Sequence, residues 1–407
     1  MPRRTALEIV QPRAFIFFLL AIAVLLGIVT SANAQLKTVT AFRSTIEMER
    51  PAFRASQAIT VRFHLTNTSG AALNVLKWQT PLEEFTAPIF QVHKDGVLVP
   101  YIGKLVKRGA PTADDYVSIA PGQTVSSTID LAEGYAIADS GQYTVEFSSA
   151  LLDFGDAAPS ALAARKSLIP QLIRSNNVPF QVLEARKLPP TLPPGEGTAA
   201  KQPAFQSCSQ TQQPVLSQAL QDADTLTIGA SLVLHAQQSN NAQCPRYKTW
   251  FGTYDATRWT TVTNHFDKLH DALANKTVTF HCDCNQGWYA YVYPNQPYHV
   301  WVCNAFWSAP ANGTDSKAGT IVHETSHFNV VAQTQDHVYG QYGCKNLATN
   351  DPAKAIQNAD SHEYFGENTP SQKCGVEQVP MSLLIIAVAA IGDRVRRRKL
   401  SKRAERR

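Results

Sequence analysis

The chain has 407 residues, of which 44% are hydrophobic and 17% charged, and its formal net charge is +5. The excess of positive charge lies at the ends: residues 393–407 hold nine Lys or Arg against two acidic residues, and residues 1–34 hold three against one. The body therefore carries about −4, which removes the main argument for a nucleic-acid partner. Its length of about 345 residues is more than one core usually holds.

Residues 1–34 predict a secretory signal peptide. Three arginines precede an apolar run from about Ala14 to Val29, and the segment ends in Ala32-Asn33-Ala34, a small-residue cleavage pattern. The alternative is a retained membrane anchor, but the run is short for a span of about 20 residues. We expect bacterial-type export to the medium or the cell surface, with only transient membrane contact.

Residues 35–186 have the periodicity of β-strands. Apolar residues alternate with polar ones over 61–66 and again over 143–147, with turn signals between such segments. This pattern predicts an antiparallel β-sandwich. The sequence D-x-G-x-Y at 139–143 resembles the tyrosine corner of immunoglobulin-like domains, and the lack of cysteine before Cys208 places the resemblance with the disulfide-free members.

A Pro- and Gly-rich linker, residues 187–204, separates this domain from residues 205–375, where the pattern changes. Apolar residues there recur at helical spacing, and one intervening segment, 277–294, has the pattern of a strand, a turn and a strand. The second domain is therefore predicted to be mainly helical with a small sheet. The helical segments are 212–236, 257–274, 318–331 and 352–366.

The segment His323-Glu324-Thr325-Ser326-His327 lies in an apolar helical context. Histidines four residues apart share one helix face and can grip one zinc ion, while the glutamate between them can reach a metal-bound water. Alone, the motif is moderately specific, because chance matches occur on solvated helix faces.

The third protein ligand distinguishes the possible classes. A metzincin would need histidine at position 333, where this chain has Gln333. A thermolysin-like site would take a glutamate from a later helix, for which Glu363 is a candidate. Asp336, nine residues after His327, is the third possibility.

Three segments resemble the deuterolysin or aspzincin family of zinc endopeptidases, and most closely its peptidyl-Lys metalloendopeptidase branch. They are HETSHF (323–328), TQDHVYG (334–340) and NADSHEYFGEN (358–368). The likeness spans about 205–370 and implies a zincin-like α+β metalloprotease domain. Gln333 stands where the family has glycine, a departure that spares every ligand.

By this resemblance, His323, His327 and Asp336 would bind one zinc ion per chain. Glu324 would be the general base, and the Tyr339 hydroxyl would face the developing oxyanion. Zinc lowers the pKa of water toward about 7, and a carboxylate can then take the proton. For Tyr339, the alternative is a ring that merely packs under the loop.

Asp360 and Glu363 are three residues apart in a predicted helix and can project to one side. They match the acidic pair that lines the pocket of the lysine-specific branch. The expected reaction is cleavage of protein or peptide substrates on the N-terminal side of lysine. The alternative is an exposed acidic helix face, and neither neighbouring histidine, His337 or His362, is expected to bind metal.

All seven cysteines follow residue 207, and an odd number in an exported chain leaves one without an intramolecular partner. The resemblance implies two disulfides, Cys208–Cys282 and Cys284–Cys303. For the other three, the pairing Cys244–Cys344 is our suggestion, although nothing in the sequence fixes it.

The role of residues 35–186 has two interpretations. Some bacterial relatives carry a β-rich propeptide, and Lys187 and Lys201 offer cuts that a lysine-directed protease could make itself. A permanently attached binding module would have the same sequence pattern. Residues 376–407 combine a short apolar run with an arginine cluster, which resembles a PEP-CTERM sorting tail without its Pro-Glu-Pro; a disordered basic tail is the alternative.

These observations predict a secreted, monomeric zinc endopeptidase with a preference for lysine. The alternative is a surface or binding protein built on a degenerate protease domain. When a protease domain loses its activity in evolution, a metal ligand or the general base is usually lost first. Here His323, Glu324, His327, Asp336 and Tyr339 are all present, so the enzyme is favoured.

Overall fold

The computed structural model describes residues 38–164, 170–188, 190–192, 202–236 and 241–374. The signal peptide predicted for 1–34 and the sorting tail predicted for 376–407 lie outside these residues, as does Lys201. None of the helices in the described ranges is both long and apolar enough to cross a membrane.

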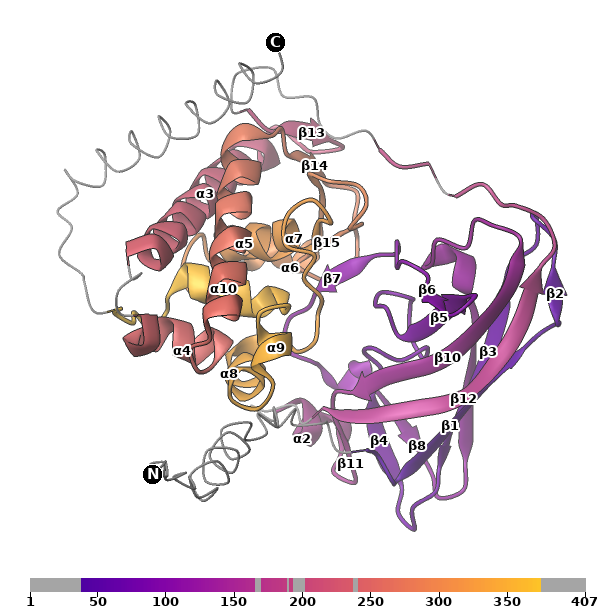
Figure 1. Ribbon diagram of the computed structural model, residues 1–407. Helices are drawn as coiled ribbons and strands as arrows, with labels where there is room; N and C mark the ends of the chain where they lie inside the picture. The colour runs from indigo at the N-terminus through magenta and orange to yellow at the C-terminus, as the bar shows by residue number, and fades with distance from the viewer. Residues whose placement is uncertain (1–37, 165–169, 189, 193–201, 237–240, 375–407) are drawn as a thin grey trace, which may run out of the picture. The chain divides into compact units, whose positions relative to one another are not determined.

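The first part of the chain is β-rich, as predicted (Figure 1). Its strands form sheets of order β1-β3-β9, β2-β12-β10-β5-β6 and β11-β4-β8. The strands are β1 Phe42–Met48, β2 Ala52–Phe53, β3 Thr60–Asn67, β4 Leu73–Leu76, β5 Phe90–Lys94, β6 Val97–Leu98, β8 Tyr116–Ile119, β9 Thr124–Asp130, β10 Gly141–Leu151, β11 Phe154–Gly155 and β12 Gln171–Val182, with a short helix α2 at Pro159–Ala163.

The alternation in the sequence produces this core directly. Strand β3 buries every second residue, and Phe63 from β3 meets Phe147 from β10 with ring centroids 4.7 Å apart. The Tyr143 hydroxyl donates to the carbonyl of Asp139 at 2.7 Å, the backbone hydrogen bond that a tyrosine corner makes.

Residues after 203 form helices around one small sheet (Figure 1). The sheet order is β13-β14-β16-β15-β7, so β7, Leu105–Lys107, reaches it from the β-rich part of the chain. The other strands are β13 Ala204–Gln206, β14 Thr279–His281, β15 Ala290–Val292 and β16 His299–Val302. The helices are α3 Gln212–Ala236, α4 Pro245–Phe251, α5 Ala256–Asn275, α6 Asn304–Ser308, α7 Lys317–His327, α8 Gly340–Asn350, α9 Pro352–Ala355 and α10 Ala359–Glu367.

The sequence pattern predicted both ends of α3 correctly and both ends of α5 to within one residue, whereas it missed α4, α6 and α8. Helix α7 ends at His327, four residues before the predicted end. The segment predicted as one helix over 352–366 is divided into α9 and α10. The two strands predicted within 277–294 are not neighbours, because β16 lies between β14 and β15.

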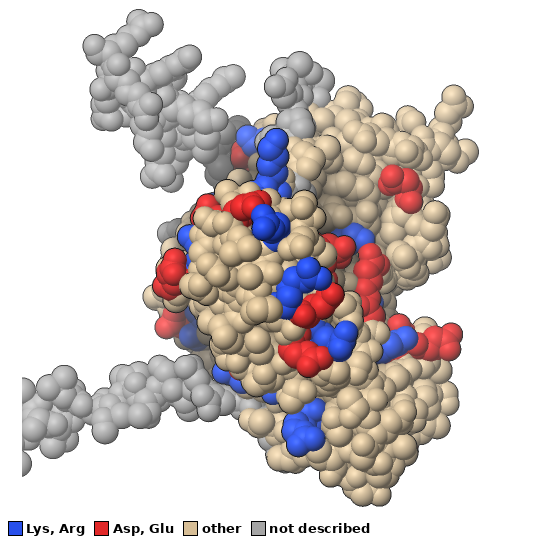
Figure 2. Space-filling model, turned by 90° about the vertical axis from the view of Figure 1, so that its right-hand side faces the viewer, with Lys and Arg blue, Asp and Glu red and all other residues tan. Residues whose placement is uncertain are grey.

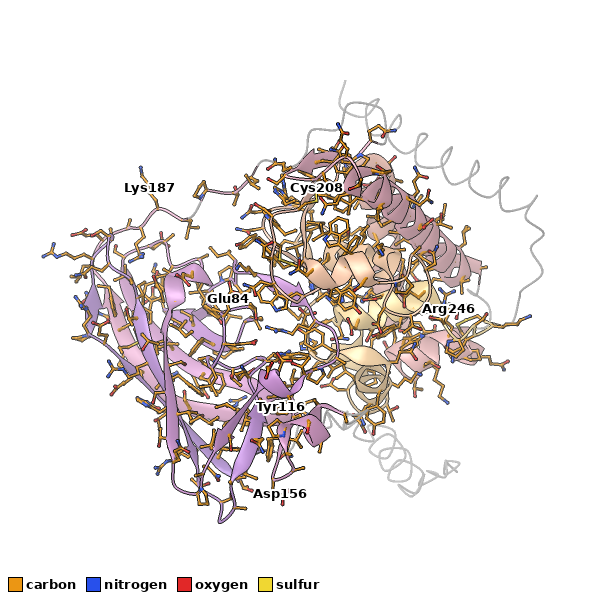
Figure 3. The ribbon with its side chains drawn as sticks, turned by 180° about the vertical axis from the view of Figure 1, so that it is seen from behind. Glu84, Tyr116, Asp156, Lys187, Cys208 and Arg246 are labelled. Atoms are coloured by element: carbon orange, nitrogen blue, oxygen red, sulfur yellow. A yellow bond between two sulfur atoms is a disulfide. The ribbon has the colours of Figure 1, made fainter. Side chains whose placement is uncertain are left out.

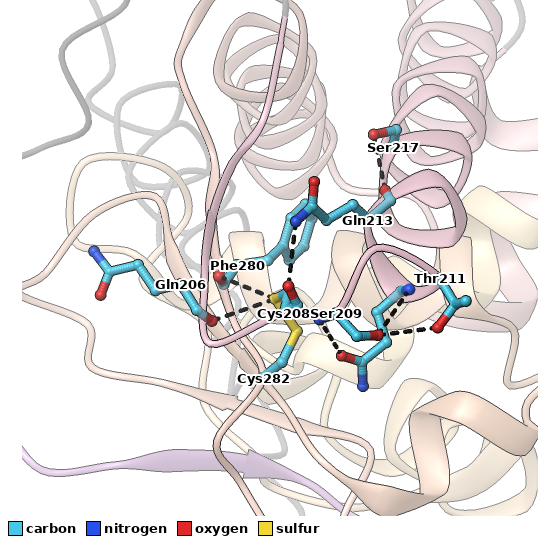
Figure 4. Close-up of a disulfide and its surroundings, with 9 residues drawn as sticks. Gln206, Cys208, Ser209, Thr211, Gln213, Ser217, Phe280 and Cys282 are labelled. Atoms are coloured by element: carbon cyan, nitrogen blue, oxygen red, sulfur yellow. Dashed lines mark hydrogen bonds between the residues drawn. A yellow bond between two sulfur atoms is a disulfide. The ribbon is translucent and has the colours of Figure 1, made fainter.

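Both disulfides implied by the family resemblance are present, Cys208–Cys282 (Figure 4) and Cys284–Cys303. The suggested pair Cys244–Cys344 is wrong: Cys244 bonds to Cys374, and Cys344 is the free cysteine. Cys344 lies buried on α8, where its sulfur accepts a hydrogen bond from Asn358, and the chain after α10 brings Cys374 to the start of α4 instead.

Acidic and basic side chains are interspersed on the face drawn in Figure 2. This mixture agrees with the small net charge of the body of the chain.

Candidate active site

Helix α7 carries the H-E-x-x-H motif and is buried from Ala318 to His327. Its N-cap is Ser316, whose hydroxyl accepts from the Gly319 amide at 2.9 Å and donates to a Glu367 oxygen on α10 at 2.8 Å. A Cβ at Gly319 would collide with the carboxylates of Glu367 and Glu363. Glycine at this position therefore lets α10 approach α7 closely enough to bring its acidic residues to the motif.

The loop after α7 returns to the motif within a few residues. The Thr334 amide donates to the Ser326 carbonyl at 3.2 Å, and the Thr334 carbonyl accepts from His327 Nδ1 at 2.9 Å. Gln333 reverses the chain with φ of 56°, in the left-handed region that favours glycine, which explains the glycine preference noted in the family.

Asn358, which lies between α9 and α10, holds the later part of this loop in place. The side-chain oxygen of Asn358 accepts from the amides of His337 at 3.0 Å and Val338 at 3.1 Å, and Gln335 forms a β-bridge with Asn358. A continuous helix over 352–366 would remove these contacts. The break thus fixes the position of Asp336.

Asp336, rather than Glu363, converges with both histidines of the motif. Its Oδ1 lies 3.2 Å from His323 Nε2 and 3.5 Å from His327 Nε2. Ligands about 2.0–2.1 Å from a tetrahedral zinc ion are about 3.3 Å apart, which these separations match. All three side chains are buried, and neither the Nε2 atoms nor the Asp336 oxygens have a hydrogen-bond partner among the described residues. The donor set therefore fits zinc.

Asp360 connects three parts of the site. Its Oδ1 lies 2.7 Å from His323 Nδ1, and its Oδ2 accepts from the Gly340 amide at 2.7 Å. The same carboxylate is 3.6 Å from the Lys107 ammonium. Burial alone would raise the pKa of Asp360, but Lys107 and His323 hold it far below its usual range, so the group remains an anion. A carboxylate behind a histidine fixes the tautomer that presents Nε2 to a metal.

Glu324 and Tyr339 face the same short stretch of backbone. Glu324 Oε1 accepts from the Lys107 amide at 3.2 Å, and the Tyr339 hydroxyl donates to the Val106 carbonyl at 3.1 Å. Burial raises the pKa of Glu324 to about 8, and burial also raises that of Tyr339 well above its usual value. The Tyr339 ring additionally packs edge-on against Trp78, at 5.7 Å between centroids.

Asp360 and Glu363 are buried, in contrast to the alternative of an exposed acidic face, and both lie within 3.6 Å of the Lys107 ammonium. The space that the Lys107 side chain fills is called the acidic pocket. The Lys107 side chain occupies this pocket, with its ammonium 2.5 Å from Glu363 Oε2. Although burial would lower the pKa of Lys107, the surrounding carboxylates raise it well above its usual value.

The sequence reasoning missed further residues of this pocket. Asp315 lies 3.6 Å from the ammonium and accepts from the Tyr364 hydroxyl, and the Lys107 nitrogen is 5.3 Å from the centroid of Tyr289. The sequence offered one signal for Asp315, which lies two residues before the helix that carries H-E-x-x-H. Of the flanking histidines, His362 packs on Phe251 and Phe266 away from the convergent ligand atoms.

A buried H-E-x-x-H helix with a third acidic group converging on its histidines is the arrangement of a zincin-like metallopeptidase. The sequence profile of the lysine-specific metallo-endopeptidases, or aspzincins, matches residues 236–367. An extracellular protease of Aeromonas hydrophila is 42% identical over 318 residues, which cover 77% of this chain and 89% of that protein. The peptidyl-Lys metalloendopeptidase of Grifola frondosa is 36% identical over 68% of this chain and 76% of its own length.

A solved structure of a zinc peptidase from Grifola frondosa is 45% identical, covers 41% of this chain and all of that chain, and has a TM-score of 0.38. The relatives establish that this chain belongs to the aspzincin family. It is a zinc metalloendopeptidase, and its substrates are proteins or peptides.

Proposed function

We propose that this endopeptidase cuts on the N-terminal side of lysine. The proposal rests on the positions of the Lys107 side chain and of the peptide bond between Val106 and Lys107. The ammonium lies against Glu363, while the preceding carbonyl meets the Tyr339 hydroxyl and the lysine amide meets Glu324. A substrate lysine bound in this way would present its own preceding peptide bond to the same groups.

In this proposal His323, His327 and Asp336 hold a single zinc ion per chain. When bound, zinc supplies Lewis acidity, which activates water and polarises a carbonyl. Asp360 orients His323 through its Nδ1 atom, and neither Asp360 nor Glu363 binds the metal.

The remaining steps fall to residues of the chain. Glu324 takes a proton from the attacking water and passes it to the amine of the leaving lysine, a role that its contact with the Lys107 amide supports. Tyr339 remains a phenol and donates to the oxygen that gains negative charge. Asp360, Glu363 and Asp315 bind the lysine ammonium, and a neutral or acidic side chain would leave these buried charges without a counterion.

The proposal extends to the organisation of the chain. A signal peptide at 1–34 directs export, residues 35–186 form an immunoglobulin-like β-sandwich that is removed as a propeptide, and the mature protease is a monomer. The exposed Lys187 points away from the β-rich part, accessible for a processing cut (Figure 3). N-terminal sequencing of the secreted protein tests this: a start at Lys187 or Lys201 supports removal, and a start at Gln35 contradicts it.

The specificity is tested by a cleavage map. The processed protein is incubated with an unfolded substrate, with and without a zinc chelator, and the new ends are identified by mass spectrometry. New N-termini that begin with lysine and disappear with chelator are expected. Chelator-sensitive cuts before other residues would contradict the roles of Asp360 and Glu363 while leaving the metalloprotease intact.

A further inference from the structure

The segment Leu105–Lys107 lies in the active site in the manner of a substrate. Strand β7 pairs antiparallel with β15, in the register Leu105 with Val292, Val106 with Tyr291 and Lys107 with Ala290 (Figure 1). Without β7, strand β15 would be the edge of the sheet in the described residues. An extended peptide that adds to a sheet edge gains main-chain hydrogen bonds, and side-chain pockets give it specificity.

The segment is also fully enclosed. Leu105, Val106 and Lys107 are each at most 1% exposed. The Tyr289 amide donates to the Lys107 carbonyl at 3.0 Å, next to the contacts with Glu324 and Tyr339 already described. No external substrate can use the pocket or these groups while the segment is in place.

Contacts on both sides anchor the segment to the β-rich part. Before it, Lys104 forms an ion pair with Glu84 and lies over the Tyr291 ring. After it, Arg108 bonds to Glu83 and Thr86. A second contact joins the same part of the chain to the loop of Asp336, whose carbonyl accepts from the Gln79 side chain.

We propose that Leu105–Lys107 is an intramolecular pseudosubstrate that keeps the intact chain latent, with Lys107 as its anchor in the acidic pocket. This inference rests on the proposed lysine specificity and adds the means by which the site is regulated. Because the segment is tethered, its effective concentration at the site is high. Even if the bond between Val106 and Lys107 were hydrolysed, the flanking anchors would keep both ends in place. Activation therefore requires departure of the β-rich part and not merely a cut in the linker.

The test compares intact chains that differ only at the anchor. Wild type, Lys107→Ala and Lys107→Met are assayed on a quenched peptide containing one lysine, with Lys94→Ala as the control. Lys94 lies on β5 and pairs with Asp95 and Asp139, away from the segment and its anchors. Both Lys107 variants should be at least about tenfold more active than wild type, equivalent to about 1.4 kcal/mol, while Lys94→Ala stays latent. Hydrogen exchange at the Tyr289 amide should accelerate only in the Lys107 variants.

Wild-type protein from which residues 35–186 have been removed, called the processed protein, distinguishes the possible negative results. If it is active while intact Lys107→Ala and Lys107→Met are folded and remain latent, the pseudosubstrate is refuted and the lysine-directed protease stands. An intact wild-type chain as active as the processed one also refutes the inference. If the processed protein cuts other peptides but none before lysine, the proposed specificity fails first. As a further check, a peptide of residues 103–109 should compete with substrate for the processed enzyme, and absence of competition counts against the proposal.

Discussion

Neutralising Glu363 should selectively remove the preference for lysine. Its Oε2 makes the shortest contact to the ammonium, 2.5 Å, and the side chain is fully buried. Loss of one partner from a buried, hydrogen-bonded charge pair costs about 2–5 kcal/mol. Because Asp360 and Asp315 remain, each 3.6 Å away, the lower part of this range applies. We expect Glu363→Gln to lower kcat/KM for cleavage before lysine about 30- to 300-fold, at about 1.4 kcal/mol per tenfold.

The assay uses processed enzyme and two peptides that differ only in lysine or methionine after the scissile bond. Glu363→Gln should lower turnover of the lysine peptide alone, with zinc content unchanged. Glu367→Gln is the matched control, because this carboxylate lies one turn further along α10 and bonds to Ser316. An equal fall on both peptides would show that Glu363 acts on the catalytic centre as a whole, and no fall at all would refute the pocket assignment.

Three further predictions concern the remaining groups. Asp360→Asn should weaken zinc binding about 10- to 100-fold as well as lysine preference, because its Oδ1 supports His323; equilibrium dialysis against chelator measures this, and unchanged affinity would contradict it. Glu324→Gln should lower kcat about 10²- to 10⁴-fold yet retain zinc, and a variant with near-normal kcat would exclude Glu324 as the base. Burial lowers the pKa of His265 to about 4 and that of His362 to about 3, so their contribution to stability is complete above about pH 6.5 and is lost as the pH falls toward 4. His265→Asn should reduce the fall in Tm between pH 7 and 4, and an unchanged fall would refute this origin.

Local patterns in the sequence were sufficient for much of the catalytic part. Helix α7 follows from apolar periodicity around H-E-x-x-H, and its two histidines must share a face because they are four residues apart. From spacing alone, the third zinc ligand could have been either Asp336 or Glu363, and the family resemblance favoured Asp336. The structure supplies the physical reason, since the turn at Gln333 and the clamp by Asn358 bring Asp336, and not Glu363, to both histidines.

Contacts between residues far apart in the sequence could not be predicted from local patterns. The partner of Cys244 depended on how the chain after α10 returns to α4, which no local pattern encodes. The division of the helix predicted over 352–366 depended on hydrogen bonds from Asn358 to a different loop.

The sequence by itself determined the chemistry of the site: which side chains can bind zinc, which carboxylate can move a proton, and which acidic pair can meet lysine. Only the tertiary structure decided what occupies that site. Lys107 is 256 residues from Glu363 along the chain, and a lysine in a short β-strand has no distinguishing pattern. Its role arises because strand pairing with β15 places one particular ammonium among buried carboxylates, and such a contact depends on position in space rather than on neighbours in sequence.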